Sequence, residues 1–148
     1  MSTFIQSLHQ IVFSTKNREN VLVESNREKL YEYIFGIIKN NKSYCYKIGG
    51  YDDHIHIIIQ LHPTVNPAFL VKDIKLATNK FIKENKLFPR FKGWQEGYGL
   101  FTYHINSKDE LIEYVKNQKE HHKKLSFKEE LILLLKEHKI EYNEEFLK

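Results

Sequence analysis

Two histidines that flank a single isoleucine, His54-Ile55-His56, stand inside an apolar run that continues to Leu61. Such a run is typical of a buried strand, and side chains alternate between the two faces of a strand. Both imidazoles should therefore emerge on one face, about 7 Å apart along the strand, where they could bind one divalent cation. A strand histidine is often only a hydrogen-bonded core residue, but two on one face favour a metal site.

A tyrosine and a glutamine form the second candidate constellation. Tyr114 and Gln118 lie four residues apart in a segment with helical periodicity, so they share one face of the predicted helix. A phenol, with a usual pKa of about 10, is a poor nucleophile and needs a polarised electrophile nearby. A phosphodiester on a cation held by His54 and His56 would be such an electrophile, and Gln118 could add an oxygen ligand. The simpler interpretation of Tyr114 is a residue at the rim of a packing face.

Four other residues are candidates for contact with nucleic acid. Lys16 and Arg18 follow the first predicted strand, where they could bind phosphate groups, with ordinary surface charge as the alternative. Trp94 and Tyr98 stand in a glycine-containing loop. They could stack on an extruded base, or they could close an edge of the core.

Two further polar pairs have simpler interpretations. His121 and His122 diverge by about 100° on a helix, so we expect a solvated basic face there rather than a metal cluster. Asp52 and Asp53 precede the histidine pair. We expect them to form a hairpin turn, with orientation of an imidazole as the alternative.

Composition narrows the class of protein. The 148 residues are 41% hydrophobic and 14% aromatic, which predicts one folded domain over residues 1–148. The formal charge of +4 favours a polyanionic partner. The single cysteine, Cys45, excludes an intrachain disulfide and fits a reducing compartment. Neither a run of transmembrane length nor the pattern of a secretory signal is found, so we expect a cytoplasmic protein.

Periodicity and helix-capping signals divide the chain into strands and helices. Strands are predicted at 4–15, 43–48, 54–61 and 98–105, and Gly49-Gly50 is expected to be the loop of a hairpin. Helices are predicted at 26–41, from Pro67 onward, from 107 to about 123, and from 126 to 135. Ser25, Ser107 and Ser126 each precede a glutamate at the spacing of a capping box, and Asn66 is a candidate cap.

The first six of these elements have the order strand, helix, strand, strand, helix, strand. This βαββαβ order predicts an α+β fold with a ferredoxin-like or RRM-like antiparallel sheet and helices on one face. The other face of the sheet is then available for a site, and C-terminal helices that carry the tyrosine follow the last strand.

Four segments together resemble the single-tyrosine HUH transposases, insertion-sequence enzymes that act on single-stranded DNA. The similar segments are 12–18, 53–56, 94–98 and 114–118, in that order. The resemblance implies a metal-dependent transesterification in which Tyr114 attacks a scissile phosphate and forms a 5′-phosphotyrosine link. The metal ligands of that family correspond to His54, His56 and Gln118, with Mg²⁺ or Mn²⁺ as the ion. It also implies recognition of DNA hairpins and a homodimer, in which active sites can combine residues of both subunits.

Two alternatives remain at this point. One is another HUH endonuclease, a replication initiator or a relaxase. Initiators commonly carry a lysine one helical turn after the tyrosine, where this chain has Asn117 and Gln118, and relaxases usually place the tyrosine near the N-terminus. The other is a non-catalytic RRM-like nucleic-acid binder, but that function needs exposed aromatic residues on the central strands, and residues 55–59 supply none.

Overall fold

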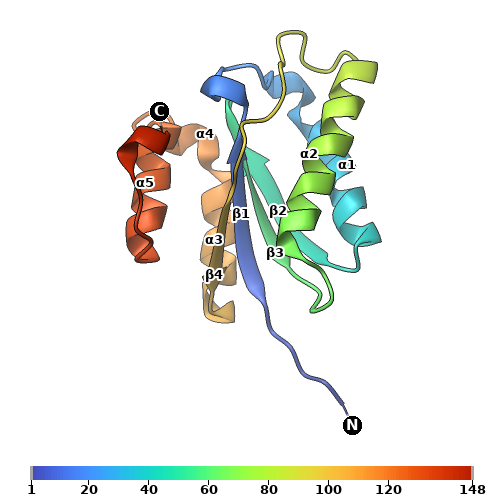
Figure 1. The fold of residues 1–148 in the computed structure, drawn as a ribbon, viewed down its shortest axis with the longest axis vertical. Helices are drawn as coiled ribbons and strands as arrows, with labels where there is room; N and C mark the ends of the chain where they lie inside the picture. The colour runs from blue at the N-terminus through green and yellow to red at the C-terminus, as the bar shows by residue number, and fades with distance from the viewer. Residues whose placement is uncertain (1, 148) are drawn as a thin grey trace.

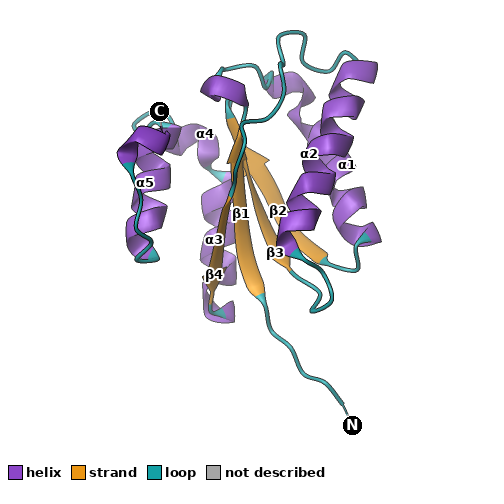
Figure 2. Ribbon diagram, viewed as in Figure 1, coloured by secondary structure: helices purple, strands orange, loops and turns teal. Residues whose placement is uncertain are grey.

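The computed structural model describes residues 2–147 and confirms the α+β fold. Figure 1 follows the chain from the N-terminus to the C-terminal helices, and Figure 2 separates helices, strands and loops. The strands are β1 (Leu8–Ser14), β2 (Tyr44–Gly50), β3 (His54–Gln60) and β4 (Gly99–Tyr103). The helices are α1 (Arg27–Asn40), α2 (Pro67–Glu84), α3 (Lys108–Lys116), α4 (Gln118–His121) and α5 (Phe127–Glu137), with short 3-10 turns between them.

The four strands form one sheet in the order β2-β3-β1-β4, with every neighbouring pair antiparallel. This is the order expected of a ferredoxin-like sheet, and it places β1 and β3 in the centre. The register pairs Val12 with His56 and Ser14 with His54. The histidine pair therefore lies on a central strand, where neighbours on both sides hold the backbone.

One face of the sheet packs against α1 and α2. Alternate residues of the central strands point to this side and are fully or nearly fully buried among apolar side chains of the two helices, namely Ile11, Phe13, Ile55, Ile57 and Ile59. Figure 2 shows both helices on the same side of the sheet. Because β3 alternates strictly, burial of its three isoleucines here directs both histidines to the opposite face.

The opposite face is covered by α3 and α5. Two smaller apolar clusters hold these helices, one around Leu8, Ile58, Leu111 and Val115, the other around Val12, Phe101, Phe127 and Leu134. Between the two clusters lie buried polar residues of the central strands, Gln10, His54 and His56. The second face therefore has apolar contacts at its flanks and a polar centre.

Two glycines that the sequence placed in a hairpin loop belong to β2 instead. Gly49 pairs with His56 and Gly50 with Ile55, and the chain turns only at residues 51–53. A Cβ on Gly49 would lie 2.4 Å from the backbone oxygen of Val115. The glycine is thus needed because it lets α3 approach the sheet closely.

The predicted caps are confirmed in part. Asn66 accepts hydrogen bonds from the backbone N–H groups of residues 68 and 69, and Ser126 and Glu129 form a capping box. The boxes predicted at Ser25 and Ser107 are wrong, because 3-10 turns precede α1 and α3 and neither serine caps its helix.

The helix predicted to continue to residue 123 is interrupted. It breaks at Asn117, which separates α3 from α4. Among residues 2–147, no helix has both the length and the apolar character that a membrane crossing requires.

Candidate active site

The two histidines of β3 lie side by side on the polar face of the sheet, as their spacing predicts. Both side chains are completely buried, and their ring centroids are 5.0 Å apart. The ring of Phe127, at the start of α5, stacks on the imidazole of His54 at 4.3 Å. The pair is therefore enclosed between β3 and α5.

Each imidazole is held by an acceptor on its Nδ1 side. His54 Nδ1 lies 2.7 Å from Asp53 Oδ1, and His56 Nδ1 lies 2.6 Å from Gln10 Oε1. Gln10 is itself fixed, since its Nε2 donates to the hydroxyl of Tyr103 at 2.9 Å. Because carboxylate and amide oxygens accept hydrogen bonds, Nδ1 of each ring is a donor. The Nε2 atoms face the centre of the site, and each carries a lone pair there when its ring is neutral.

Asp52 and Asp53 lie in the turn before β3, as the sequence predicted, and Asp53 also has the role that was offered as the alternative. Its carboxylate orients the imidazole of His54, while its backbone oxygen accepts from Thr15 N at 2.8 Å. Asp52 forms an ion pair with Arg27, a buried residue of α1. The turn before β3 is therefore tied to both β1 and α1.

The amide of Gln118 reaches the histidines from the other side. Its Oε1 lies 2.8 Å from His54 Nε2, and the side chain is 1% exposed. Gln118 is the first residue of α4, directly after the break at Asn117. The structure thus brings together the three residues that the sequence predicts as metal ligands, His54, His56 and Gln118.

Tyr114 lies at the same centre, on α3 of the same chain. Its ring centroid is 6.1 Å from the ring centroid of His56, and its hydroxyl donates a hydrogen bond to Glu130. Burial and the neighbouring carboxylate raise the pKa of Tyr114 above the usual value for a phenol. The phenol is therefore protonated here and held by a partner that accepts its proton in a hydrogen bond.

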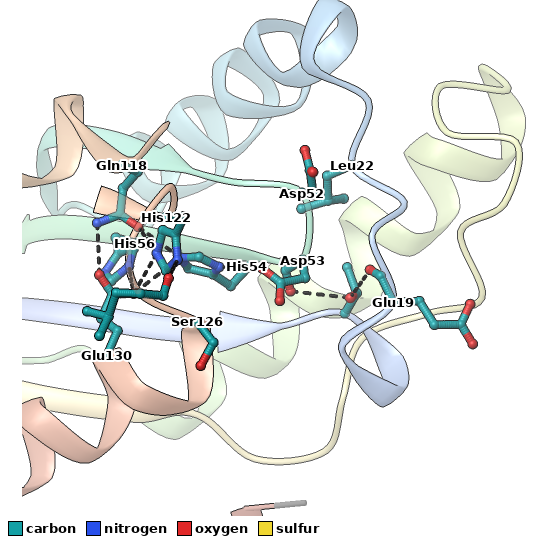
Figure 3. Close-up of polar contacts among 12 residues, drawn as sticks. Glu19, Leu22, Asp52, Asp53, His54, His56, Gln118, His122, Ser126 and Glu130 are labelled. Atoms are coloured by element: carbon teal, nitrogen blue, oxygen red, sulfur yellow. Dashed lines mark hydrogen bonds and ion pairs between the residues drawn. The ribbon is translucent and has the colours of Figure 1, made fainter. Parts of the chain in front are cut away.

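Two residues of the site were missed by the sequence analysis, Glu130 of α5 and His122 after α4 (Figure 3). Glu130 is 1% exposed, and its Oε1 lies 3.0 Å from His56 Nε2 and 3.2 Å from His122 Nε2. The expectation of a solvated basic face is wrong for His122, whose side chain is 3% exposed. His121 stacks on the ring of Tyr114 at 4.4 Å.

The sequence contained a detectable signal for His122 but none for Glu130. The divergence of adjacent helical residues showed that His121 and His122 could not both face one ion, but it left open that either could do so alone. The capping box at Ser126 located the start of α5, yet no pattern indicated which face of α5 would meet the sheet. Glu130 could not be found without the packing of α5.

The buried groups shift one another's pKa values. Burial disfavours ionisation of Glu130, but hydrogen bonds from His122, His54 and His56 outweigh it and hold its pKa well below the usual range. Burial also opposes the charged form of His54, yet hydrogen bonds to Asp53 and Glu130 raise its pKa to about 9. Burial lowers the pKa of His56. The ionised carboxylate of Glu130 therefore stabilises the protonated form of His54.

The donor atoms at this centre fit a divalent cation. His54 Nε2 and Gln118 Oε1 lie 2.8 Å apart, and Glu130 Oε1 lies 3.0 Å from His56 Nε2 and 3.3 Å from His54 Nε2. Neighbouring ligands around an octahedral ion with bonds of about 2.1 Å are about 3 Å apart. Metal-binding histidines also donate their second ring N–H to a carboxylate or carbonyl oxygen, as His54 and His56 do here.

Two of the four candidate DNA-contact residues line one cleft. Arg18 and Tyr98 border a cleft of about 280 Å³ whose wall includes Phe127. Arg18 has a left-handed backbone, with φ of 53°, and its guanidinium lies 5.8 Å from the ring centre of Phe127. Because that conformation is unfavourable for a residue with a side chain, the surrounding loop must hold it in place.

The other two candidates lie differently. Lys16 is exposed in the short turn after β1, and its backbone N–H donates to Gly93 O at 2.9 Å. Trp94 is partly buried, packs edge-on against Phe13 at 5.0 Å, and donates from Nε1 to Thr78. The contacts of Trp94 thus match the alternative offered by the sequence, an aromatic residue that closes an edge of the core.

Comparison with known proteins agrees with these features. Residues 3–118 match the family described as "Transposase IS200 like". Among proteins with curated descriptions, none matches. A crystal structure assigned to a transposase from Deinococcus radiodurans R1 is similar, with 19% identity, a TM-score of 0.60, and coverage of 80% of this chain and 95% of that one. The structure of a REP-associated tyrosine transposase bound to a REP hairpin is also similar, with 15% identity, a TM-score of 0.60, and coverage of 82% and 72% respectively.

Proposed function

The chain belongs to the IS200-like transposase family, and we propose that it cleaves and rejoins single-stranded DNA at insertion-sequence ends through a 5′-phosphotyrosine intermediate. This family membership disfavours the replication initiator, the relaxase and the non-catalytic RRM-like binder that the sequence left open. We further propose that residues 1–148 form one domain that acts in the cytoplasm, where such DNA is found.

One observation carries the proposal: the hydroxyl of Tyr114 lies at the buried cluster of His54, His56 and Gln118 within a single chain. Tyr114 reaches the cluster through its hydrogen bond to Glu130, which also accepts from Gln118 Nε2 at 3.0 Å. A nucleophile and a set of metal-ligand side chains are thereby held together by the fold before any substrate arrives. Such preorganisation reduces the entropic cost of the reaction.

The chemistry follows from the nature of each residue. The oxygen of Tyr114 forms a bond to the scissile phosphorus, the bond from phosphorus to the 3′-oxygen breaks, and the 3′-oxygen leaves as a hydroxyl. The ester link retains the energy of the phosphodiester, so attack by a different 3′-hydroxyl reverses the step and joins the strands. His54, His56 and Gln118 would hold Mg²⁺ or Mn²⁺, which supplies polarisation of the phosphate when bound. Imidazole nitrogen favours Mn²⁺ of the two.

The experiment that tests this function uses single-stranded oligonucleotides that carry the hairpin and flank from an end of the element. Incubation with the protein and Mn²⁺ should give a covalent protein–DNA species in denaturing gels, together with a released strand that ends in a 3′-hydroxyl. A strand that is bound but never cleaved, across Mg²⁺ and Mn²⁺ titrations, would refute the proposed reaction.

We propose that Arg18 and Tyr98 contact DNA in the cleft beside Phe127, and that Lys16 adds a phosphate contact at the exposed turn. The cleft combines a cation with aromatic side chains, which suits an unpaired nucleotide. Trp94 then supports the loop that carries Tyr98, since its own ring is used in packing. Because the Phe127 ring separates the cleft from His54, we propose that this ring moves aside when DNA is bound.

Substitution of the cleft residues should weaken DNA binding. We expect Arg18→Gln to lower affinity for the single strand and to reduce the slope of log affinity against log salt by about 1, because one phosphate contact is lost. Tyr98→Ala should cost about 1–3 kcal/mol of stacking. Fluorescence anisotropy over a salt series measures both. Arg90→Gln and Tyr44→Ala, exposed residues outside the cleft, serve as controls. Equal losses in test and control variants would contradict the assignment.

We propose a homodimer in which each active site is complete within one subunit, because Tyr114 and the histidines converge in a single chain. A mixture of His56→Ala and Tyr114→Phe proteins should then show no cleavage, since neither chain contains a whole site. Adduct formation measured after mixing and re-equilibration tests this. Recovery of about a quarter of wild-type activity, as random exchange of subunits would give with composite sites, would contradict it.

A further inference from the structure

We propose that Glu130 and His122 are ligands of the catalytic metal ion, and that Glu130 also holds the tyrosine nucleophile, so that one carboxylate connects the ion to the attacking oxygen. The inference rests on the proposed function for the identity of the nucleophile. It adds two metal-binding residues that lie beyond residue 118, where the match to the family ends.

The three imidazoles of the cluster have the same orientation. His122 resembles the two strand histidines, since its Nδ1 lies 2.6 Å from the backbone oxygen of Leu125, an acceptor, which assigns its proton to Nδ1. Its Nε2 then directs a lone pair inward, 3.0 Å from Gln118 Oε1. All three imidazoles therefore bind outward through an N–H group and, when neutral, present a bare nitrogen to the centre.

The three Nε2 atoms surround one carboxylate oxygen. Glu130 Oε1 lies 3.0 Å from His56 Nε2, 3.2 Å from His122 Nε2 and 3.3 Å from His54 Nε2. With all three rings neutral, five acceptor atoms would face one another in a buried space: three nitrogens and the Oε1 atoms of Gln118 and Glu130. Acceptors repel unless a cation lies among them, and one proton can neutralise only part of the set.

The donor set itself suits a divalent ion. The ligand atoms of His54, His122 and Glu130 all lie within 4.8 Å of one another. A carboxylate is the ligand that Mg²⁺ and Mn²⁺ prefer, and it would neutralise one charge of the ion in a site that is otherwise neutral. Gln118 alone would give the ion only an uncharged oxygen.

The second oxygen of Glu130 makes the link to the nucleophile. Oε2 accepts from the hydroxyl of Tyr114 and from Gln118 Nε2, whereas Oε1 faces the imidazoles. The carboxylate is rigid, so Oε1 is directed toward the imidazole nitrogens while Oε2 is directed toward the phenol of Tyr114. Glu130 would therefore fix the distance between the ion and the tyrosine oxygen, in addition to binding the ion.

The test measures metal binding in the full-length protein without DNA. Mn²⁺ affinity is obtained from the electron paramagnetic resonance signal of free Mn²⁺, and the Mn²⁺-induced rise in melting temperature is a second readout. We expect Glu130→Gln, which is nearly isosteric, and His122→Ala to weaken Mn²⁺ binding by about 10-fold or more. Glu137→Gln, an exposed glutamate two turns further along α5, is the matched control and should bind like the wild type.

Each outcome decides the matter. Unchanged or tighter Mn²⁺ binding by folded Glu130→Gln would overturn the inference, because the carboxylate would then compete with the ion or be irrelevant to it. Should that variant fail to fold, Glu130→Asp keeps the charge and is expected to bind Mn²⁺ with intermediate affinity; wild-type affinity in a folded aspartate variant would also count against a ligand at this position. Wild-type protein that binds Mn²⁺ through Glu130 but forms no DNA adduct would refute the proposed function and leave the ligand assignment intact.

Discussion

Tyr114→Phe is expected to eliminate the covalent protein–DNA adduct while leaving DNA binding within about 2-fold of the wild type, because the substitution removes only the attacking oxygen. We expect a loss of at least about 10³-fold in the cleavage rate, because the neighbouring hydroxyl of Tyr103 contacts Gln10 and not Glu130. Denaturing gels with a labelled hairpin oligonucleotide measure the adduct, and anisotropy measures binding.

Tyr103→Phe is the matched control for this substitution. Tyr103 is also a partly buried tyrosine at the polar face, and its hydroxyl accepts a hydrogen bond from Gln10. Loss of that hydroxyl should leave adduct formation largely intact, although it weakens the support of His56. An adduct that persists in Tyr114→Phe would assign the nucleophile to another residue.

His56→Ala is expected to abolish the stimulation of cleavage by Mn²⁺, with a rate lower by at least about 10²-fold. The substitution removes a nitrogen that faces the centre and leaves Gln10 Oε1 without its hydrogen-bond partner. Since a buried polar group loses its hydrogen bond, we also expect about 1–3 kcal/mol of lost stability. Rates over a Mn²⁺ titration, with melting curves at each point, separate the two effects.

Two controls distinguish loss of the metal site from loss of the folded structure. His62→Ala removes a histidine from the loop after β3, where the ring contacts Thr64 away from the site, and should cleave like the wild type. Wild-type protein treated with a chelator should lose cleavage and regain it when Mn²⁺ is restored. Cleavage by His56→Ala at the wild-type rate, with the same Mn²⁺ dependence, would contradict the metal site.

The sequence predicted the fold because its periodic patterns are strong and local. The isoleucines of β3 and their alternation with His54 and His56 fix which face of the strand is apolar, and this alone predicted a polar centre on the other face. The caps at Asn66 and Ser126 gave correct helix starts for the same reason, since the partners of a cap lie within three residues.

Features that depend on contacts between distant elements were not predictable. Gly49 was placed in a loop because glycine is common in turns, whereas its actual reason is the close approach of Val115. The break at Asn117 leaves no mark in the periodicity, yet it separates α3 from α4 directly before Gln118. Glu130 is one of many glutamates in the chain, and only the docking of α5 through Phe127 and Leu134 places it in the site.

The resemblance to a known family contributed the chemistry that spacing could not supply. His54, His56, Tyr114 and Gln118 were identified as a set because their order matches a known pattern, and the structure brings the four together. Glu130 and His122 lie outside the four segments that resemble the family. They could be identified only in the folded chain, because the hydrogen-bond partners of each side chain must be known before its free donor and acceptor atoms can be assigned.

The most direct measurement is the identification of the amino acid linked to DNA in the wild-type protein. After reaction with a single-stranded hairpin substrate and Mn²⁺, the adduct is digested with protease and nuclease and analysed by tandem mass spectrometry. We predict one modified peptide, with the nucleotide 5′-phosphate on the oxygen of Tyr114, lost when Mn²⁺ is chelated. A phosphate on any other residue, or cleavage without a protein-linked nucleotide, would contradict the site described here.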